Sequence, residues 1–382
     1  MSEIGQLRLL RLAAVLSLLL ALVNHLLPPK AFAATQLLFD YHFGLIRRGL
    51  AGQGIDLFAG PVISMPEIYL AAALVTLSGA LAFYIYLRRA FDGQVASLLL
   101  LVLALNSFAF ASFIGNTGYL DGLLLLVLVA ALSSDARQWH GLVLRVLAAV
   151  IGVLLHENML PYFTVLIAFD LWLARVGRAA WPVAFLPLLA AALAVALLVA
   201  TAPLVQDQGA AFTAYLKAKA GFQLDATSTI VAGRSIGDNL ALMADLRGTA
   251  KYAIWVLFDG LPLLAMSLWL LWLGNRLLRD RSVATRLLLA AAILAPLSLN
   301  VVAFDVVRFG VASVLCGFIA LALVLKHHPP AKAILADTLT WPHLLLVLVL
   351  NVNMFTTQVN MTDGQAHAFP WALLAQMKWL GP

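Results

Sequence analysis

Charged residues are scarce in this sequence. Asp, Glu, Lys and Arg make up 11% of its 382 residues, whereas a typical soluble domain has about 25%. Hydrophobic residues reach 63%, and many apolar runs approach or exceed the roughly 18 residues that indicate a membrane-spanning helix. This excludes an ordinary soluble protein and predicts an all-α polytopic membrane protein.

Motifs of several common chemistries are also missing. The single cysteine, Cys316, cannot form an intrachain disulfide or a cysteine metal cluster. The sequence contains no Walker loop and no dinucleotide-binding GxGxxG fingerprint. The net charge of +6 does not indicate nucleic-acid binding, because the basic residues are distributed among short turns between apolar runs.

The apolar runs predict about eleven transmembrane helices in a single integral membrane domain spanning 1–382. We place them at 9–27, 67–87, 95–113, 119–132, 142–155, 159–173, 182–202, 251–273, 287–304, 309–325 and 341–356. Between and after them lie two long loops, at about 28–66 and 203–250, and a tail at 357–382. Short helices are expected near 210–220 and 236–247, the second with Asp238 as its N-cap.

The arginines and lysines predict the orientation. With the N-terminus in the cytoplasm, every short turn on that side is basic, as the positive-inside rule requires. Both long loops and the tail then lie outside, and we expect a bacterial inner membrane with the site on its periplasmic face. The first apolar segment could be a signal peptide cleaved after Ala31-Phe32-Ala33, but Pro28-Pro29-Lys30 lengthens the gap to that motif and favours an uncleaved anchor.

The stretch from Phe39 to Leu50 follows the first apolar segment. As a helix it would align Phe39 with Phe43 on one stripe, and Asp40 with Arg47 on the next. This pattern predicts an amphipathic helix at the membrane interface. The alternative is a connector whose arginines reach lipid headgroups. Arg48 points about 100° away from Arg47 on such a helix, although a break near Gly49 would let both turn inward.

Polar residues recur at three further outer helix ends, where buried charges are usually paired or functional. They are Asp121, at the start of one span; His156 and Glu157, between two spans; and Asp305 and Arg308, between two others. Structural explanations exist for each. Asp121 could cap its helix or pair with an arginine, His156 and Glu157 could form a solvated turn, and Asp305 could neutralise Arg308.

Such a site suits a lipid substrate with a phosphate at headgroup depth. Arginine binds phosphate with a planar fork, and a carboxylate can accept the proton of an attacking hydroxyl. A polyprenyl-phosphate sugar combines these features. The layout resembles the GT-C class of membrane glycosyltransferases, which carry an acid in the first outer loop just after the first span. The matching stretch here is Asp40-Tyr41-His42-Phe43-Gly44-Leu45-Ile46-Arg47-Arg48-Gly49.

The resemblance implies a role for each candidate residue. Asp40 would be the catalytic base, and Arg47, Arg48, His156 and Arg308 would bind the donor phosphate. Glu157 and Asp121 would hold the acceptor sugar or orient the arginines, with Asp305 beside Arg308. The sequence departs from the class in having no paired acids in that loop and no large outer domain, so it predicts no metal site, and dependence on a divalent metal stays open.

Two other functions fit the sequence. An outer-face polysaccharide polymerase or ligase would need similar arginines and a histidine. A transporter or flippase of a lipid-linked substrate should show broken helices or polar residues near the bilayer midplane, where the predicted spans are mostly Leu, Ala and Val. The expected partners are the bilayer, a polyprenyl-phosphate sugar and a glycan, lipid or protein acceptor, with no nucleic acid.

Overall fold

The computed structural model describes residues 2–175, 180–233, 236–303, 305–339 and 345. Within these ranges the chain is helical and has no named strand. An isolated β bridge pairs Ile63 with Ala220. This agrees with the all-α prediction.

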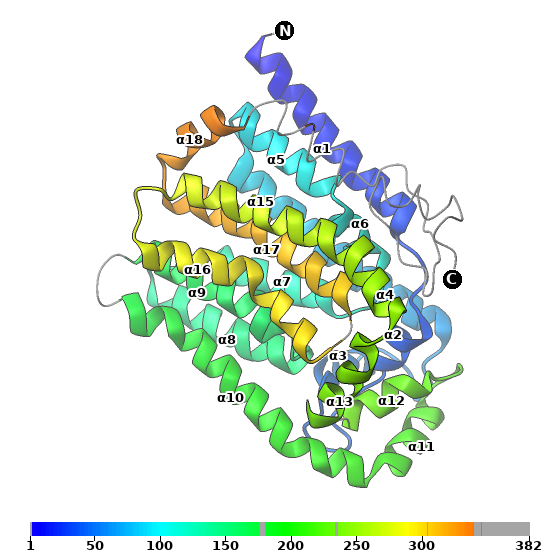
Figure 1. Ribbon diagram of the computed structural model, residues 1–382. Coiled ribbons are helices and arrows are strands. Elements are labelled where there is room, and N and C mark those ends of the chain that lie inside the picture. Colours follow the sequence, from blue (N-terminus) through cyan, green and yellow to red (C-terminus); the bar gives the residue numbers. More distant parts are fainter. Residues whose placement is uncertain (1, 176–179, 234–235, 304, 340–344, 346–382) are drawn as a thin grey trace.

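The first half of the chain contributes a long N-terminal helix, two short loop helices and a row of apolar helices (Figure 1). They are α1 (Glu3–His25), α2 (Ala31–Gln36), α3 (Gly49–Asp56), α4 (Met65–Phe91), α5 (Val95–Leu105), α6 (Phe108–Gly115), α7 (Asp121–Leu132), α8 (Trp139–Leu155), η1 (Leu160–Thr164) and α9 (Val165–Ala174).

The second half adds another group of short helices and the central helix of the bundle. These elements are α10 (Ala180–Asp207), α11 (Gly209–Lys219), α12 (Ala226–Gly233), α13 (Ile236–Arg247), α14 (Ala250–Trp255), η2 (Val256–Gly260), α15 (Leu261–Leu277), α16 (Val283–Leu294), η3 (Ala295–Val301), α17 (Val306–His327) and α18 (Ala331–Thr338).

Five helices in the described ranges are long and apolar enough to cross a membrane. They are Glu3–His25, Met65–Phe91, Trp181–Thr201, Val283–Val301 and Val306–His327. Five shorter apolar helices of 10–17 residues lie among them. Helices therefore cover every predicted span up to 309–325, and the membrane-protein character is confirmed. The predicted span 341–356 falls outside the described residues except for 345, as does the tail 357–382.

Helix α17 forms the centre of the bundle. Of its most apolar window, 94% is buried inside the protein, compared with 22% for the window in α1. Its glycines allow α15 to pack closely. A Cβ on Gly310 would lie 2.7 Å from Leu263, and one on Gly317 would lie 2.6 Å from Leu270. Small residues at such contacts are how helices approach one another in membranes.

The bundle has two distinct ends in Figure 1. We call the end with α2, α3 and α11–α13 the α3 end, and the opposite end, with α18 and the start of α1, the α18 end. Both α11 and α13 lie where short helices were predicted. Asp238 lies in the first turn of α13, which already begins at Ile236, so its prediction as the N-cap is wrong.

The amphipathic helix predicted over Phe39–Leu50 is also wrong. The chain from 39 to 48 runs through turns and bends, and a helix begins only at Gly49. Two residues explain this. Gly44 has φ +91°, and Arg48, which precedes α3, has φ +65°; both angles belong to the left-handed region that interrupts a right-handed helix. The first loop therefore holds two short helices, α2 and α3, joined by an irregular segment.

Candidate functional site at the α3 end

Arg308 is the anchor of a polar cluster at the α3 end. It lies in the first turn of α17 and binds Asp121, the first residue of α7, through two contacts: Nε to Oδ2 at 2.6 Å and Nη2 to Oδ1 at 2.8 Å. Its guanidinium also lies 4.7 Å from the centre of the Tyr119 ring. Asp305 is the N-cap of α17, and its carboxylate accepts a hydrogen bond from the Arg308 N–H. Thus Asp121, not Asp305, neutralises the Arg308 side chain.

His156 and Glu157 extend the cluster from the junction between α8 and η1. Arg308 Nη2 lies 3.2 Å from His156 Nε2, and Glu157 Oε2 lies 3.3 Å from His156 Nδ1. Glu157 in turn binds Arg48 of the first loop, with Nη2 to Oε1 at 2.7 Å and Nε to Oε2 at 3.3 Å. A continuous chain of contacts therefore runs from α7 through α17 and the α8–η1 junction to the first loop. We call these residues the Arg308 cluster: Arg48, Asp121, His156, Glu157 and Arg308.

The electrostatics of this cluster keep His156 neutral. Burial and the positive charge of Arg48 lower the pKa of His156 to about 3. Arginine can only donate, so the His156 nitrogen that faces Arg308 must be the unprotonated one, and the ring proton lies on Nδ1 toward Glu157. The N–H of Asn158 also points at Nδ1, at 3.1 Å. A neutral imidazole cannot accept from both donors, and the bond from the charged Arg308 is the stronger one.

Glu157 is held as a carboxylate. Burial raises its pKa, but the electrostatic effects of Arg48, His156 and Arg47 and the hydrogen bond from Arg48 together outweigh burial and hold the pKa well below its usual range. The Arg308 cluster therefore alternates charges along its length, and each arginine already faces a carboxylate.

A second group surrounds Asp40, which is 3% exposed. Lys219, the last residue of α11, places its Nζ 2.6 Å from Asp40 Oδ2, 2.6 Å from Asp56 Oδ1 and 3.0 Å from the Leu38 carbonyl. Tyr215 donates its hydroxyl to Asp40 Oδ2 at 2.5 Å. The ammonium thus joins two carboxylates of the first loop to the second loop. We call Asp40, Asp56, Tyr215 and Lys219 the Asp40 cluster.

The ionisation of Asp40 depends on these donors. Burial raises the pKa of Asp40, while the hydrogen bonds from Lys219, Tyr215 and the His42 N–H lower it, and the net pKa lies below the usual value. The pKa of Asp56 is instead raised, because burial and the nearby Asp40 charge outweigh Lys219. Asp40 is therefore a carboxylate whose oxygens are already occupied by donors.

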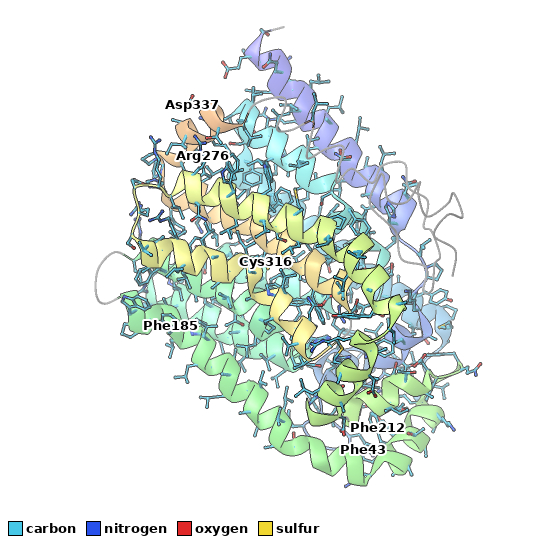
Figure 2. The ribbon with its side chains drawn as sticks, in the orientation of Figure 1. Phe43, Phe185, Phe212, Arg276, Cys316 and Asp337 are labelled. Atoms are coloured by element: carbon cyan, nitrogen blue, oxygen red, sulfur yellow. The ribbon has the colours of Figure 1, made fainter. Side chains whose placement is uncertain are left out.

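Aromatic rings cover the Asp40 cluster. His42 stacks on Tyr215 with ring centres 4.4 Å apart and planes 6° from parallel. Phe212 packs edge-on against Phe39 and Phe43, at 5.4 and 5.7 Å. Figure 2 shows Phe43 and Phe212 together at the α3 end. Helix α11 is thus held against the first loop by aromatic packing as well as by Lys219.

The structure brings most of the predicted site residues together. Arg48, Asp121, His156, Glu157 and Arg308 form one connected cluster, as the expected convergence requires. The helical pattern predicted that Asp40 and Arg47 share one helix face. This is wrong, because residues 39–48 do not form a helix. Asp40 faces Lys219 instead.

Sequence reasoning missed Lys219, Tyr215 and Asp56. None of them has a spacing pattern that links it to its partner. Asp40 and Lys219 lie 179 residues apart in the sequence, so only the folded chain reveals that they are paired. Within the described ranges, no group of three or more His, Cys, Asp or Glu side chains is placed to hold a metal ion.

Comparisons with models of protein families, with curated proteins and with solved structures found no match for this chain. The class that the fold defines is an all-helical membrane protein. The site has to be interpreted from its own chemistry.

Proposed function

We propose that this protein is a glycosyltransferase that moves a sugar from a polyprenyl-phosphate donor to a glycan, lipid or protein acceptor. The observation that carries the proposal is the convergence of the Arg308 cluster and the Asp40 cluster on the first loop. Arg48 and Asp40 lie eight positions apart in that loop. Arg48 is joined to the α8–η1 junction and through it to α17, and Asp40 is joined to α11. In the proposed topology of about eleven spans, this end faces the periplasm.

The arginines would bind the donor phosphate. Arg308 presents a two-pronged contact to Asp121, and Arg48 presents one to Glu157. A phosphate offers the same kind of acceptor oxygens as these carboxylates, so it would bind by taking over part of their contacts. Arg47, whose charge reaches Glu157, would add a further cation. These charges would stabilise the leaving phosphate as the bond to the sugar breaks.

Asp40 would act as the base. The Tyr215 hydroxyl now donates to Asp40 Oδ2, and an acceptor hydroxyl would occupy the same kind of position. In the proposed step, the acceptor oxygen attacks the anomeric carbon and its proton passes to Asp40. The bond from the anomeric carbon to the phosphate oxygen breaks, and the polyprenyl phosphate leaves with the electron pair. Lys219 must loosen from Asp40 first, because its ammonium suppresses the basicity of the carboxylate.

A transporter of a lipid-linked substrate is the second candidate. It is favoured by the interruption at Asn106 and Ser107, where α5 ends and α6 begins inside the predicted span 95–113. Broken helices are common at transporter binding sites. A polymerase or ligase would use the same arginines and His156, and differs only in transferring a longer glycan.

The decisive experiment replaces Asp40 by Asn. Membranes that contain the variant are incubated with polyprenyl-phosphate-linked mannose, glucose or galactose, and sugar transfer is measured. Asp40→Asn should abolish transfer, whereas Asp92→Asn, at an exposed acid paired with Arg11, should leave it intact. Wild-type transfer by Asp40→Asn would refute the base assignment. If the wild type transfers no sugar but catalyses counterflow of the lipid-linked sugar in proteoliposomes, and Asp40→Asn loses this counterflow, the protein is a transporter.

Labelling with a membrane-impermeant thiol reagent tests the proposed topology. Cysteines are introduced singly at positions 40, 121, 157 and 305 in a Cys316→Ala background. All four should react from the same side of the membrane. Reaction of any one from the cytoplasmic side would contradict the convergence of these helix ends at the outer face.

A further inference from the structure

A small, mainly apolar cavity lies between α1 and the break that separates α5 from α6. It has a volume of about 20 Å³, which is room for about one water-sized group. Its lining consists of Ser17, Leu20, Ala21, Asn24, His25, Leu105, Asn106, Ser107 and Ala111. None of these residues belongs to the Arg308 or Asp40 cluster, so the cavity is separate from the proposed active site.

Two buried polar atoms on residues that line this cavity have no hydrogen-bond partner in the described part of the chain. They are Oδ1 of Asn106, a residue that is 7% exposed, and Nδ1 of His25, which is 3% exposed. The rest of the Asn106 amide is satisfied, because its Nδ2 donates to Ser17 Oγ at 2.6 Å and to the Val102 carbonyl at 2.8 Å. Leaving a polar group unpaired inside a membrane is costly, so two such atoms at one cavity indicate a ligand.

The chemistry of the two atoms selects the ligand. The Asn106 oxygen can only accept, so the ligand must donate a hydrogen bond. An imidazole nitrogen can accept or donate according to its tautomer, and a hydroxyl group can serve it either way. No charged side chain lines the cavity, so an anion or a cation would be bound there without compensation.

The mouth of the cavity borders an apolar surface. Leu20, which lines the cavity, is 42% exposed, and Leu16 and Val23 on the same helix are 48% and 81% exposed. In a bilayer these leucines and the valine would contact acyl chains. A long-chain alcohol could therefore place its hydroxyl in the cavity and its chain along α1.

We propose that this cavity is a binding site for a neutral hydroxyl group that donates to Asn106, supplied by a lipid alcohol or by a water molecule. The test compares two lipids with identical tails. Delipidated protein is titrated with dioleoylglycerol and with its O-methyl ether, which lacks the donor, and bound lipid is measured by native mass spectrometry. If the lipid is the source, the alcohol should bind about tenfold more tightly than the ether, the size expected for one hydrogen bond.

The variants use matched residues. His25→Phe keeps a ring of similar size and removes the nitrogen, so it should reduce the preference for the alcohol. Asn106→Leu should remove the preference. Ser112→Ala serves as the control, because Ser112 carries another buried hydroxyl without a partner on α6 and does not line the cavity. Melting temperatures show whether each variant folds.

If alcohol and ether bind equally, a high-resolution map in lipid nanodiscs tests whether a water molecule supplies the hydroxyl group. A water molecule within hydrogen-bond distance of Asn106 Oδ1 then assigns the hydroxyl to water and supports the proposal. Equal binding of the two lipids together with a dry cavity overturns it. Both outcomes are independent of sugar transfer, and so of the proposed function.

Discussion

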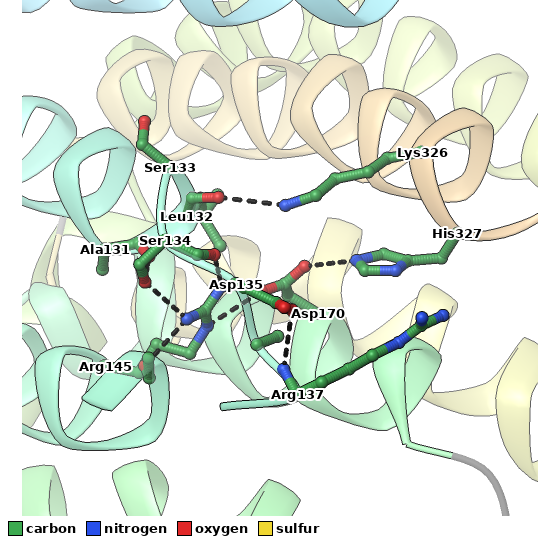
Figure 3. A network of polar contacts seen from close by, with 12 residues as sticks. Ala131, Leu132, Ser133, Ser134, Asp135, Arg137, Arg145, Asp170, Lys326 and His327 are labelled. Carbon is green, nitrogen blue, oxygen red and sulfur yellow. Dashed lines mark hydrogen bonds and ion pairs between the residues drawn. The ribbon is translucent and has the colours of Figure 1, made fainter. Parts of the chain in front are cut away.

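Two arginine–aspartate pairs of the same chemical type lie at opposite ends of the bundle. At the α18 end, Arg145 of α8 binds Asp170 of α9, and both side chains are fully buried. Figure 3 shows Arg145 and Asp170 with their partners Ser134 and His327. The remaining arginine donors bind the Ser134 hydroxyl and carbonyl and the Gly141 carbonyl, and His327 of α17 lies 2.7 Å from the other Asp170 oxygen.

The pair at the α3 end is different. Asp121 is 13% exposed and Glu157 is 26% exposed, and Arg308 shares its donors between Asp121 and His156. Both Asp170 oxygens are bound by side chains of the protein, Arg145 and His327. We therefore interpret this buried pair as structural, joining α8, α9 and α17. In the proposed function, the more open pair would exchange part of its carboxylate contact for a phosphate. The same residue types are therefore fully buried at one end and partly exposed at the other, where we propose that they bind the substrate.

Arg145→Met should have the largest effect on stability. It leaves the Asp170 carboxylate buried without its arginine, which costs about 3–5 kcal/mol. Denaturant unfolding in detergent measures the loss. The double variant Arg145→Met/Asp170→Leu should recover much of it, because no charge remains to be paired. A single variant as stable as the wild type would show that this pair is not structural.

Lys219→Met tests whether the ion pairs of the Asp40 cluster stabilise the fold as the Arg145–Asp170 pair does. At neutral pH it leaves two carboxylates in a largely buried place, at a cost of about 2–3 kcal/mol. The sign with pH is distinctive. Without Lys219, burial raises the pKa of Asp40, so the folded state binds protons more readily than the unfolded state and stability should increase as the pH falls.

The same variant should move the acidic limb of the sugar-transfer activity to higher pH. Lys217→Met is its matched control on α11, since Lys217 is exposed, and it should change stability by less than about 0.5 kcal/mol. Equal effects of the two variants on stability and pH profile would remove Lys219 from the site.

His156→Gln examines the open cluster. Because the pKa of His156 is about 3 in the folded protein and about 6.5 when unfolded, the unfolded state takes up the proton first. The contribution of neutral His156 is complete above about pH 6.5 and is lost progressively as the pH falls toward 3. Between pH 7.5 and pH 5 the wild type should lose about 2 kcal/mol through this residue. Glutamine keeps an acceptor for Arg308 and does not titrate, so the variant should lose less; identical acid sensitivity would contradict a buried neutral histidine.

Arg48→Met should have the smallest effect on stability and a large effect on activity. Its partner Glu157 is partly exposed, so the loss should be about 1–2 kcal/mol, less than for Arg145→Met. Sugar transfer should nevertheless fall at least tenfold, because a phosphate contact is lost. Arg48→Lys should recover stability better than activity, since a point charge replaces the fork. A variant that is strongly destabilised but fully active would reverse the contrast between the two ends.

Much of the fold could be predicted because the length and composition of apolar runs report directly on membrane helices. The convergence of Asp121, His156, Glu157 and Arg308 was predictable for the same reason, since residues at successive helix ends of one side must meet. The conformation of the first loop was not. Helical spacing suggested a helix from Phe39, but Gly44 and Arg48 have left-handed angles, and the loop around them contacts Phe212 of α11 and Glu157.

The sequence by itself determined a helical membrane protein with polar residues at its helix ends, because scarce charges in an apolar chain can lie only at helix ends or in pairs. Only the tertiary structure decided the partners. Asp40 binds Lys219 rather than lying beside Arg47 on a helix. The Arg145–Asp170 pair is fully buried, whereas the Arg308–Asp121 pair is partly exposed. Those choices depend on side chains up to 187 residues apart in the chain, brought within hydrogen-bond distance by helix packing that no local pattern encodes.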